Sequence, residues 1–165
     1  MLSFLQIMTL VVVAMAMALG LAHALELPGK MRLNKDIYFA VQRIYYPGFT
    51  IGGFSEPAAL ILTVVLLFYT SRATVAFWLT VVALIGLLAM QIVYWTIIHA
   101  VNKVWLRGET LSSPASGFFG LGRIQSQSGA ASPEWTDLRN RWEYAHLARA
   151  FLAAMSFIAL VIAIF

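Results

Sequence analysis

The chain has no cysteine and very little charge. The absence of cysteine from its 165 residues excludes disulfides, thiolate metal sites and a cysteine nucleophile. Only 11% of the residues are charged, whereas 61% are hydrophobic. Soluble domains are closer to half apolar and about a quarter charged. The composition therefore predicts an integral membrane protein, and the length predicts a single membrane domain over residues 1–165.

Charge is absent above all from the long apolar runs. A membrane-spanning helix needs about 20 predominantly apolar residues, and the chain offers four such runs. We therefore predict an all-α fold, an integral membrane four-helix bundle. The predicted spans are about 2–25, 46–70, 73–99 and 143–165.

The first run could also be a signal peptide, because the letters AHA before Leu25 imitate a small-residue cleavage site. No Lys or Arg precedes this run, although a signal peptide normally begins with positive charge. We therefore expect a retained transmembrane helix.

The basic residues predict the orientation. The net charge of +4 is compatible with nucleic-acid binding, but these residues flank apolar runs, so we expect no nucleic-acid partner. With four spans, Arg72 alone lies on the side of the termini. The positive-inside rule then predicts a bacterial inner (plasma) membrane protein with cytoplasmic long loops and extracytoplasmic termini. The basic residues on the cytoplasmic side are Lys30, Arg32, Lys35, Arg43, Lys103, Arg107, Arg123, Arg139, Arg141 and Arg149.

Two connecting segments have distinct compositions. Residues 30–45 alternate charged and apolar positions, which predicts a short amphipathic helix at the membrane interface. Residues 108–133 are rich in Gly, Ser and Ala, which predicts a flexible loop within the long cytoplasmic connection.

Three histidines are present, and each belongs to a different predicted span: His23, His99 and His146. Counting about 20 residues inward from each outer end places them at similar depth, near the cytoplasmic edge. Polar residues accompany them at helical spacing, and Glu56 lies deeper beside Pro57. The accompanying residues are Glu26, Lys30, Gln91, Trp95, Asn102, Arg139, Trp142, Glu143 and Arg149.

This pattern has two interpretations. Ionisable residues within spans usually face a bundle interior or a cavity, which favours a functional site. Near an interface, however, His, Trp, Lys and Arg are also ordinary anchors that extend toward headgroups. Glu56 is the residue that anchoring explains least.

Two chemistries fit a site of this composition. His23-x-x-Glu26 and Glu143-x-x-His146 resemble the one-turn pairs of helix-bundle metal sites, and His99 could add a ligand. Alternatively, a His or Glu acts as a base while Arg, Lys, Asn and Trp N–H groups stabilise an anion. Because Lys30 and Arg149 supply counter-charges for the carboxylates, we expect no metal, with iron or copper as the alternative.

Three stretches carry a resemblance to a known family. The segments HALELPGKMRL, VYWTIIHAVNKVW and RWEYAHLARA resemble segments of a widespread family of small four-helix membrane proteins. This family includes the fungal anthrone oxygenases. The most specific marks are Asn102 and the pattern Trp142, His146, Arg149.

The resemblance implies an oxygenase that uses neither a metal nor an organic cofactor. Deprotonation of an anthrone gives a carbanion that passes an electron directly to O₂. By resemblance, His146 or His99 is the base, and Arg149 and Asn102 stabilise the anion. The supporting or substrate-binding residues are then His23, Glu26, Lys30, Glu56, Trp95, Trp142 and Glu143.

We therefore predict an oxygenase-like membrane protein that acts on a hydrophobic aromatic or quinone-like molecule. Its expected partners are the lipid bilayer and this small molecule. One alternative is a non-catalytic accessory or assembly subunit of a larger membrane complex, or a homo-oligomer. A metal-binding redox protein or a small transporter is a further alternative, although the outer half of the spans has few polar residues for transport.

Overall fold

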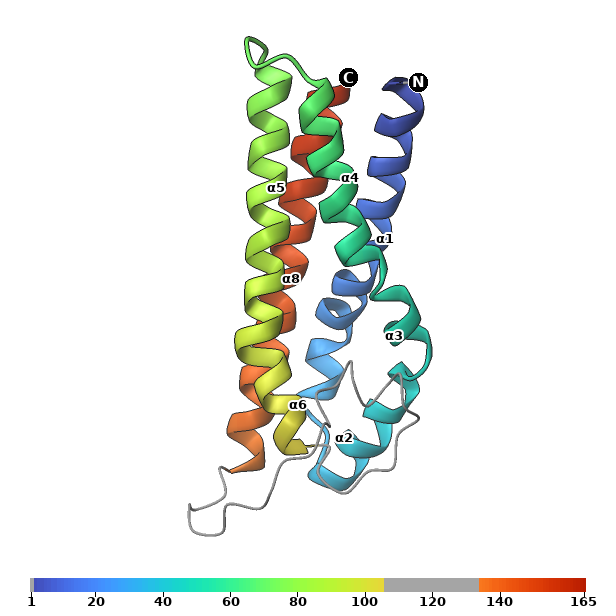
Figure 1. The fold of residues 1–165 in the computed structure, drawn as a ribbon. Coiled ribbons are helices and arrows are strands. Elements are labelled where there is room, and N and C mark those ends of the chain that lie inside the picture. Colours follow the sequence, from blue (N-terminus) through green and yellow to red (C-terminus); the bar gives the residue numbers. More distant parts are fainter. Residues whose placement is uncertain (1, 106–133) are drawn as a thin grey trace.

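A computed structural model describes residues 2–105 and 134–165. The described residues form helices and short connections, without strands (Figure 1). The elements are α1 (Leu2–Lys30), α2 (Lys35–Gln42), η1 (Arg43–Tyr45), α3 (Gly48–Gly52), α4 (Ser55–Tyr69), α5 (Val75–Val93), η2 (Tyr94–Ile98), α6 (His99–Trp105) and α8 (Trp135–Ile164).

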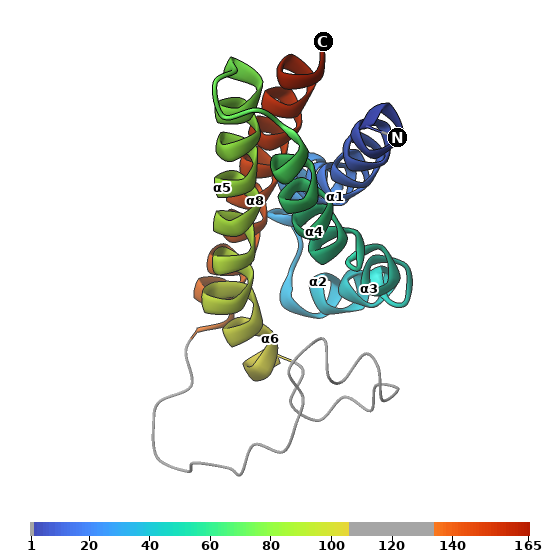
Figure 2. The same ribbon diagram turned by 45° about the horizontal axis from the view of Figure 1, so that its top comes forward.

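Four helical stretches are long and apolar enough to cross a membrane: Leu2–Lys30, Gly48–Tyr69, Val75–Val104 and Trp135–Ile164. The predicted all-helical class and membrane character are confirmed at this level. Helix α8 packs against both α1 and α5, and α4 packs against α1 and α5. The two termini and the α4–α5 turn lie at one end, and α2, α3 and α6 lie toward the other (Figures 1 and 2).

Helix α1 continues past its apolar run. It passes through Pro28 and ends at Lys30, about one turn beyond the predicted span. Because successive turns of one helix present positions i, i+3 and i+7 on a shared face, Glu26 and Lys30 follow His23 toward the same interior. The ionisable residues at the end of the first apolar run are therefore part of the bundle.

The second span is interrupted, as the Gly- and Pro-containing stretch indicates. Helix α3 ends at Gly52, and α4 begins at Ser55. Glu56 thus lies in the first turn of α4, where the positive end of the helix dipole favours a carboxylate. The break explains how a glutamate is accommodated within an otherwise apolar span.

The third span contains a π-helical turn, η2, between α5 and α6. A π-turn closes i→i+5 hydrogen bonds, so it contains more residues than an α-helical turn. The residues after it are therefore rotated relative to the α-helical register that the sequence pattern assumes. This rotation changes which side chains of the span face the bundle.

The predicted interfacial helix is present in part of its range. Asn34 caps α2 by accepting a hydrogen bond from the Ile37 amide at 3.0 Å. Tyr38 and Tyr45 are buried, whereas Ile37 is exposed. The placement of this segment at a lipid surface remains a prediction, and the predicted flexible loop 108–133 lies outside the described residues.

The α5–α8 contact depends on small residues. A methyl group built on Gly86 would lie 2.2 Å from Ser156 Oγ and 3.3 Å from the Leu152 carbonyl oxygen. Ser156 is itself buried and donates to that carbonyl at 2.8 Å. Close approach of backbones at small residues is how membrane helices gain packing contacts.

We expect Gly86→Ala to destabilise the protein by about 1–3 kcal/mol, because overpacking forces α5 and α8 apart. Unfolding midpoints in detergent micelles measure this effect. Gly29→Ala is the matched control, since a methyl group there meets nothing within 4 Å. Adding Ser156→Ala should recover part of the loss, because it removes the nearest atom. Equal midpoints for the two glycine variants would contradict the packing argument.

Candidate functional site

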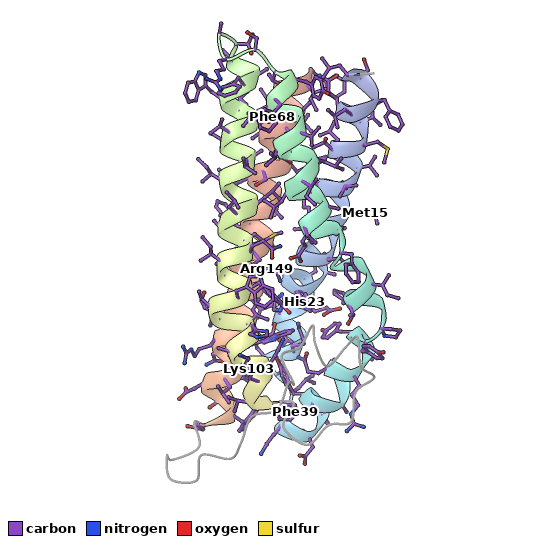
Figure 3. All side chains as sticks on the ribbon, in the orientation of Figure 1. Met15, His23, Phe39, Phe68, Lys103 and Arg149 are labelled. Atoms are coloured by element: carbon purple, nitrogen blue, oxygen red, sulfur yellow. The ribbon has the colours of Figure 1, made fainter. Side chains whose placement is uncertain are left out.

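A group of polar side chains from α1, α4, α5, α6 and α8 gathers in the half of the bundle away from the termini. We call it the polar cluster. Figure 3 labels two of its members, His23 and Arg149, whose side chains lie between the helices, whereas Met15 and Phe68 point outward. The polar cluster consists of His23, Glu26, Lys30, Glu56, Gln91, Asn102, Trp142, Glu143, His146 and Arg149.

Lys30 is the centre of one half of this cluster. Its ammonium nitrogen lies 3.0 Å from Glu143 Oε2, 3.5 Å from Glu26 Oε2 and 3.5 Å from His23 Nδ1. The ammonium group therefore lies between two carboxylates and an imidazole. Lys30 is only 4% exposed and Glu143 1%. The pair therefore holds two opposite charges away from water, joining α1 to α8.

Two tyrosines from outside the spans donate hydrogen bonds to the carboxylates of Glu143 and Glu26. Tyr38 donates to Glu143 Oε1 at 2.7 Å, and Tyr45 donates to Glu26 Oε2. Burial, followed by the nearby carboxylate, raises the pKa of Tyr38. Burial and the hydrogen bond to Glu26 raise the pKa of Tyr45 likewise. Both phenols therefore remain protonated donors at neutral pH.

His23 and His146 form a ring pair at the centre of the cluster. Their ring centroids are 4.0 Å apart with the planes tilted by 37°. Trp142 lies against both rings, at 5.1 Å from His23 and 4.1 Å from His146. Tyr45 and Phe49 contact His23 at 4.7 and 4.8 Å. The imidazoles are thus enclosed by aromatic surfaces and are each only 6% exposed.

The other half of the cluster is an ion pair around Glu56. Arg149 binds Glu56 Oε1, and Gln91 donates to Glu56 Oε2 at 2.8 Å. Arg149 also reaches His146 Nδ1 at 3.4 Å and lies over the Tyr94 ring at 5.3 Å. The deep carboxylate therefore has a partner from α8 and another from α5.

Asn102 contacts the cluster through Trp142. The indole Nε1–H of Trp142 donates to Asn102 Oδ1 at 3.0 Å, and both residues are buried. In this hydrogen bond the side-chain oxygen of Asn102 is the acceptor. It orients the indole ring that covers the histidine pair, so Asn102 acts on the pair through Trp142.

His99 and Trp95 are not brought into the cluster. His99 is half-buried and contacts the rings of Trp95 and Tyr94, at 4.9 and 6.3 Å. Trp95 is 58% exposed. The expectation that these residues join Gln91 and Asn102 on one face is therefore a mistake of register. Gln91 precedes the π-turn and contacts Glu56, Asn102 follows it and contacts Trp142, and Trp95 lies within it and is exposed.

Several contributing residues have no clear signal in the sequence. The spacing places Tyr38 and Tyr45 on the side of segment 30–45 that faces lipid or protein, without deciding between the two, and it gives no such indication for Phe49 and Tyr94. Tyr94 is additionally displaced by the π-turn. The one available signal is aromatic enrichment between residues 38 and 49, which is equally typical of an interfacial anchor.

The carboxylates of the two His/Glu pairs, which could have been metal ligands, contact cationic side chains instead. An ammonium bridges the carboxylates of Glu26 and Glu143, and a guanidinium binds Glu56. Within residues 2–105 and 134–165, no group of three or more His, Asp or Glu is placed to hold a metal ion. The absence of a cofactor remains a prediction.

A pocket at the opposite end, between α1, α4, α5 and α8, has a volume of about 220 Å³. Its polar lining includes Gln6 and several hydroxyl side chains, and the remaining lining is apolar. Its lining includes no charged residue and no member of the polar cluster.

Comparison with known proteins adds no relative: no family model, curated protein or solved structure matches the chain. The resemblance to the anthrone oxygenase family therefore remains a prediction, and the geometry of the polar cluster carries the functional argument.

Proposed function

We propose that the protein is a membrane-embedded oxygenase-like protein that acts on a hydrophobic aromatic or quinone-like molecule at the polar cluster. The observation that carries this proposal is the buried His23–His146 pair, which is flanked by two cations and enclosed by aromatic rings. Titratable groups at such depth are expensive, and membrane proteins retain them where chemistry or binding requires them.

The surroundings of the pair suit an aromatic molecule that becomes an anion. Trp142, Tyr45 and Phe49 provide flat apolar contacts. Arg149 and Lys30 provide positive charge beside the rings. In a medium of low dielectric constant, preorganised positive charge stabilises a developing anion strongly.

The proposed reaction needs no group beyond the substrate, O₂ and these side chains. A base removes a proton from an acidic ring CH₂, and the carbanion passes an electron to O₂. Recombination forms a carbon–oxygen bond, and loss of water leaves a carbonyl, so that R₂CH₂ and O₂ give R₂C=O and H₂O. The roles of His146 or His99 as base, and of Arg149 and Asn102 as stabilisers, rest on the resemblance.

Oxygen uptake by the purified protein tests this proposal. Anthrone supplies an acidic ring CH₂, and anthracene is the matched compound of similar outline without one. We expect uptake with anthrone above the spontaneous rate, no uptake with anthracene, and no effect of a chelator. A rate equal to that of empty micelles would contradict the proposal, and inhibition by the chelator would replace the metal-free reaction.

A second candidate function is favoured by the completeness of the pairing. Glu26, Glu56 and Glu143 each have a cation and a hydrogen-bond donor as partners. Such a closed network would also suit a structural accessory subunit of a membrane complex. Co-purification of a stoichiometric partner, together with no oxygen uptake, would favour this reading.

We propose a bacterial inner membrane location with the polar cluster at the cytoplasmic end. The basic asymmetry supports it, because Arg72 lies in the α4–α5 turn, whereas Lys35, Arg43 and Lys103 belong to α2, η1 and α6 at the opposite end of the bundle.

Single-cysteine labelling tests this orientation, since the chain has no cysteine of its own. Ser71 and Asn34 are both exposed and lie at opposite ends. We expect Ser71→Cys to react with an impermeant maleimide in intact cells, and Asn34→Cys to react only after permeabilisation. The reverse pattern would invert the topology and move the cluster to the outer side.

A further inference from the structure

The contact between Arg149 and His146 determines which nitrogen of His146 carries a proton. Arg149 reaches Nδ1 of this imidazole at 3.4 Å. A guanidinium has five donors and no acceptor, so Nδ1 must accept. The ring proton then lies on Nε2. Histidine tautomers are generally set by the partner of the other nitrogen in this way.

The Nε2 atom of His146 has no partner among the residues that the structure describes, and it is buried. The Nε atom of Arg149, on the next turn of α8, is also buried and has no hydrogen-bond partner among these residues. A buried donor without an acceptor is unfavourable, and such groups in folded proteins call for an explanation. Each of these two atoms is therefore a buried donor whose acceptor is not among the described residues.

We propose that His146 Nε2–H is the hydrogen-bond donor to an oxygen of the bound molecule, a planar aromatic carrying a carbonyl or phenolate group. This inference rests on the proposed function and specifies its substrate class. Aromatic rings surround the pair and offer flat contacts to a planar molecule, and Arg149 adds positive charge to the same imidazole at Nδ1. In this role His146 stabilises charge on the oxygen of the bound molecule.

Access to this site requires movement of rings that cover the pair. Nε2 has no surface open to solvent in the structure. The rings of Tyr45 and Phe49, from η1 and α3, contact His23. A planar ligand can replace these contacts with its own ring, which preserves the aromatic surroundings of the imidazoles.

The ring protonation is tested by ¹⁵N NMR of protein labelled at histidine, because protonated and unprotonated ring nitrogens have well-separated shifts. The chain has three histidines, so His23→Gln and His99→Gln assign the spectrum. We expect His146 to carry its proton on Nε2 alone in the wild-type protein. A proton on Nδ1 would overturn the proposal, and this readout needs neither turnover nor a His146 variant.

The ligand class is tested with fluorenone and fluorene, which share a planar outline and differ in the carbonyl oxygen. We expect fluorenone to shift the Nε2 resonance and to bind His146→Leu about tenfold more weakly, the loss of roughly one hydrogen bond. His146→Gln, which keeps a donor, should bind fluorenone nearly as the wild type does. Fluorene affinity should be equal in all three proteins.

Equal affinity of the two probes, without dependence on residue 146, would overturn the proposal even if the protein consumed oxygen with anthrone. Binding with the expected dependence, in a protein that consumes no oxygen, would uphold the donor role and contradict the oxygenase proposal. The two proposals therefore fail separately.

Discussion

His146→Ala is expected to lower the rate of anthrone-dependent oxygen uptake by about 100- to 1,000-fold. A preorganised donor to a developing oxyanion is typically worth about that much, and a general base contributes at least about 100-fold. The loss is therefore expected for either role of this imidazole. Arg149 lies beside the same ring, so its removal should produce a loss of similar size.

The arginine variant needs a compensating change, because Arg149→Leu alone leaves the Glu56 carboxylate without its cation. The variant to assay is thus Arg149→Leu combined with Glu56→Gln, which removes both charges together. Trp78→Leu serves as the control, since Trp78 is exposed on α5 and belongs to the end of the termini. Retention of near-wild-type uptake by the two site variants, in folded protein, would exclude these residues from the reaction.

Lys30→Met is expected to destabilise the protein by about 3–5 kcal/mol. Removing one partner of a buried ion pair leaves the other charge uncompensated. Glu143 is fully buried and would retain the Tyr38 hydroxyl as its donor, but no cation within 4.0 Å among the described residues. Chemical denaturation in detergent micelles measures the change, which should exceed that of any surface substitution.

Lys35→Met is the matched control, because Lys35 is exposed in the first turn of α2. Its effect should remain within about 0.5 kcal/mol. Combining Lys30→Met with Glu143→Gln should recover more than half of the loss, since the buried carboxylate is then neutral. If Lys30→Met is as stable as Lys35→Met, the buried pair does not hold α1 against α8.

The sequence by itself determined the helical class, the membrane character and which helices carry polar groups. These properties follow from local composition, because a span needs only length and apolarity, and a charge within it is visible directly. The α8 pattern Trp142, His146, Arg149 could be assigned to one face because α8 is an uninterrupted α-helix. Trp142, His146 and Arg149 are buried together with Glu143, whereas Trp135 and Arg139 at the same spacing are only partly buried.

Only the tertiary structure decided which charges are partners and which residues leave the cluster. The continuation of α1 through Pro28 places Lys30 between Glu26 and Glu143, and no local pattern predicts that contact between α1 and α8. Trp95 lies within the π-turn and is exposed, although its spacing from Gln91 predicts a shared face in a regular α-helix. Pairing and rotation depend on how whole helices pack, and helical periodicity along one segment contains no information about either.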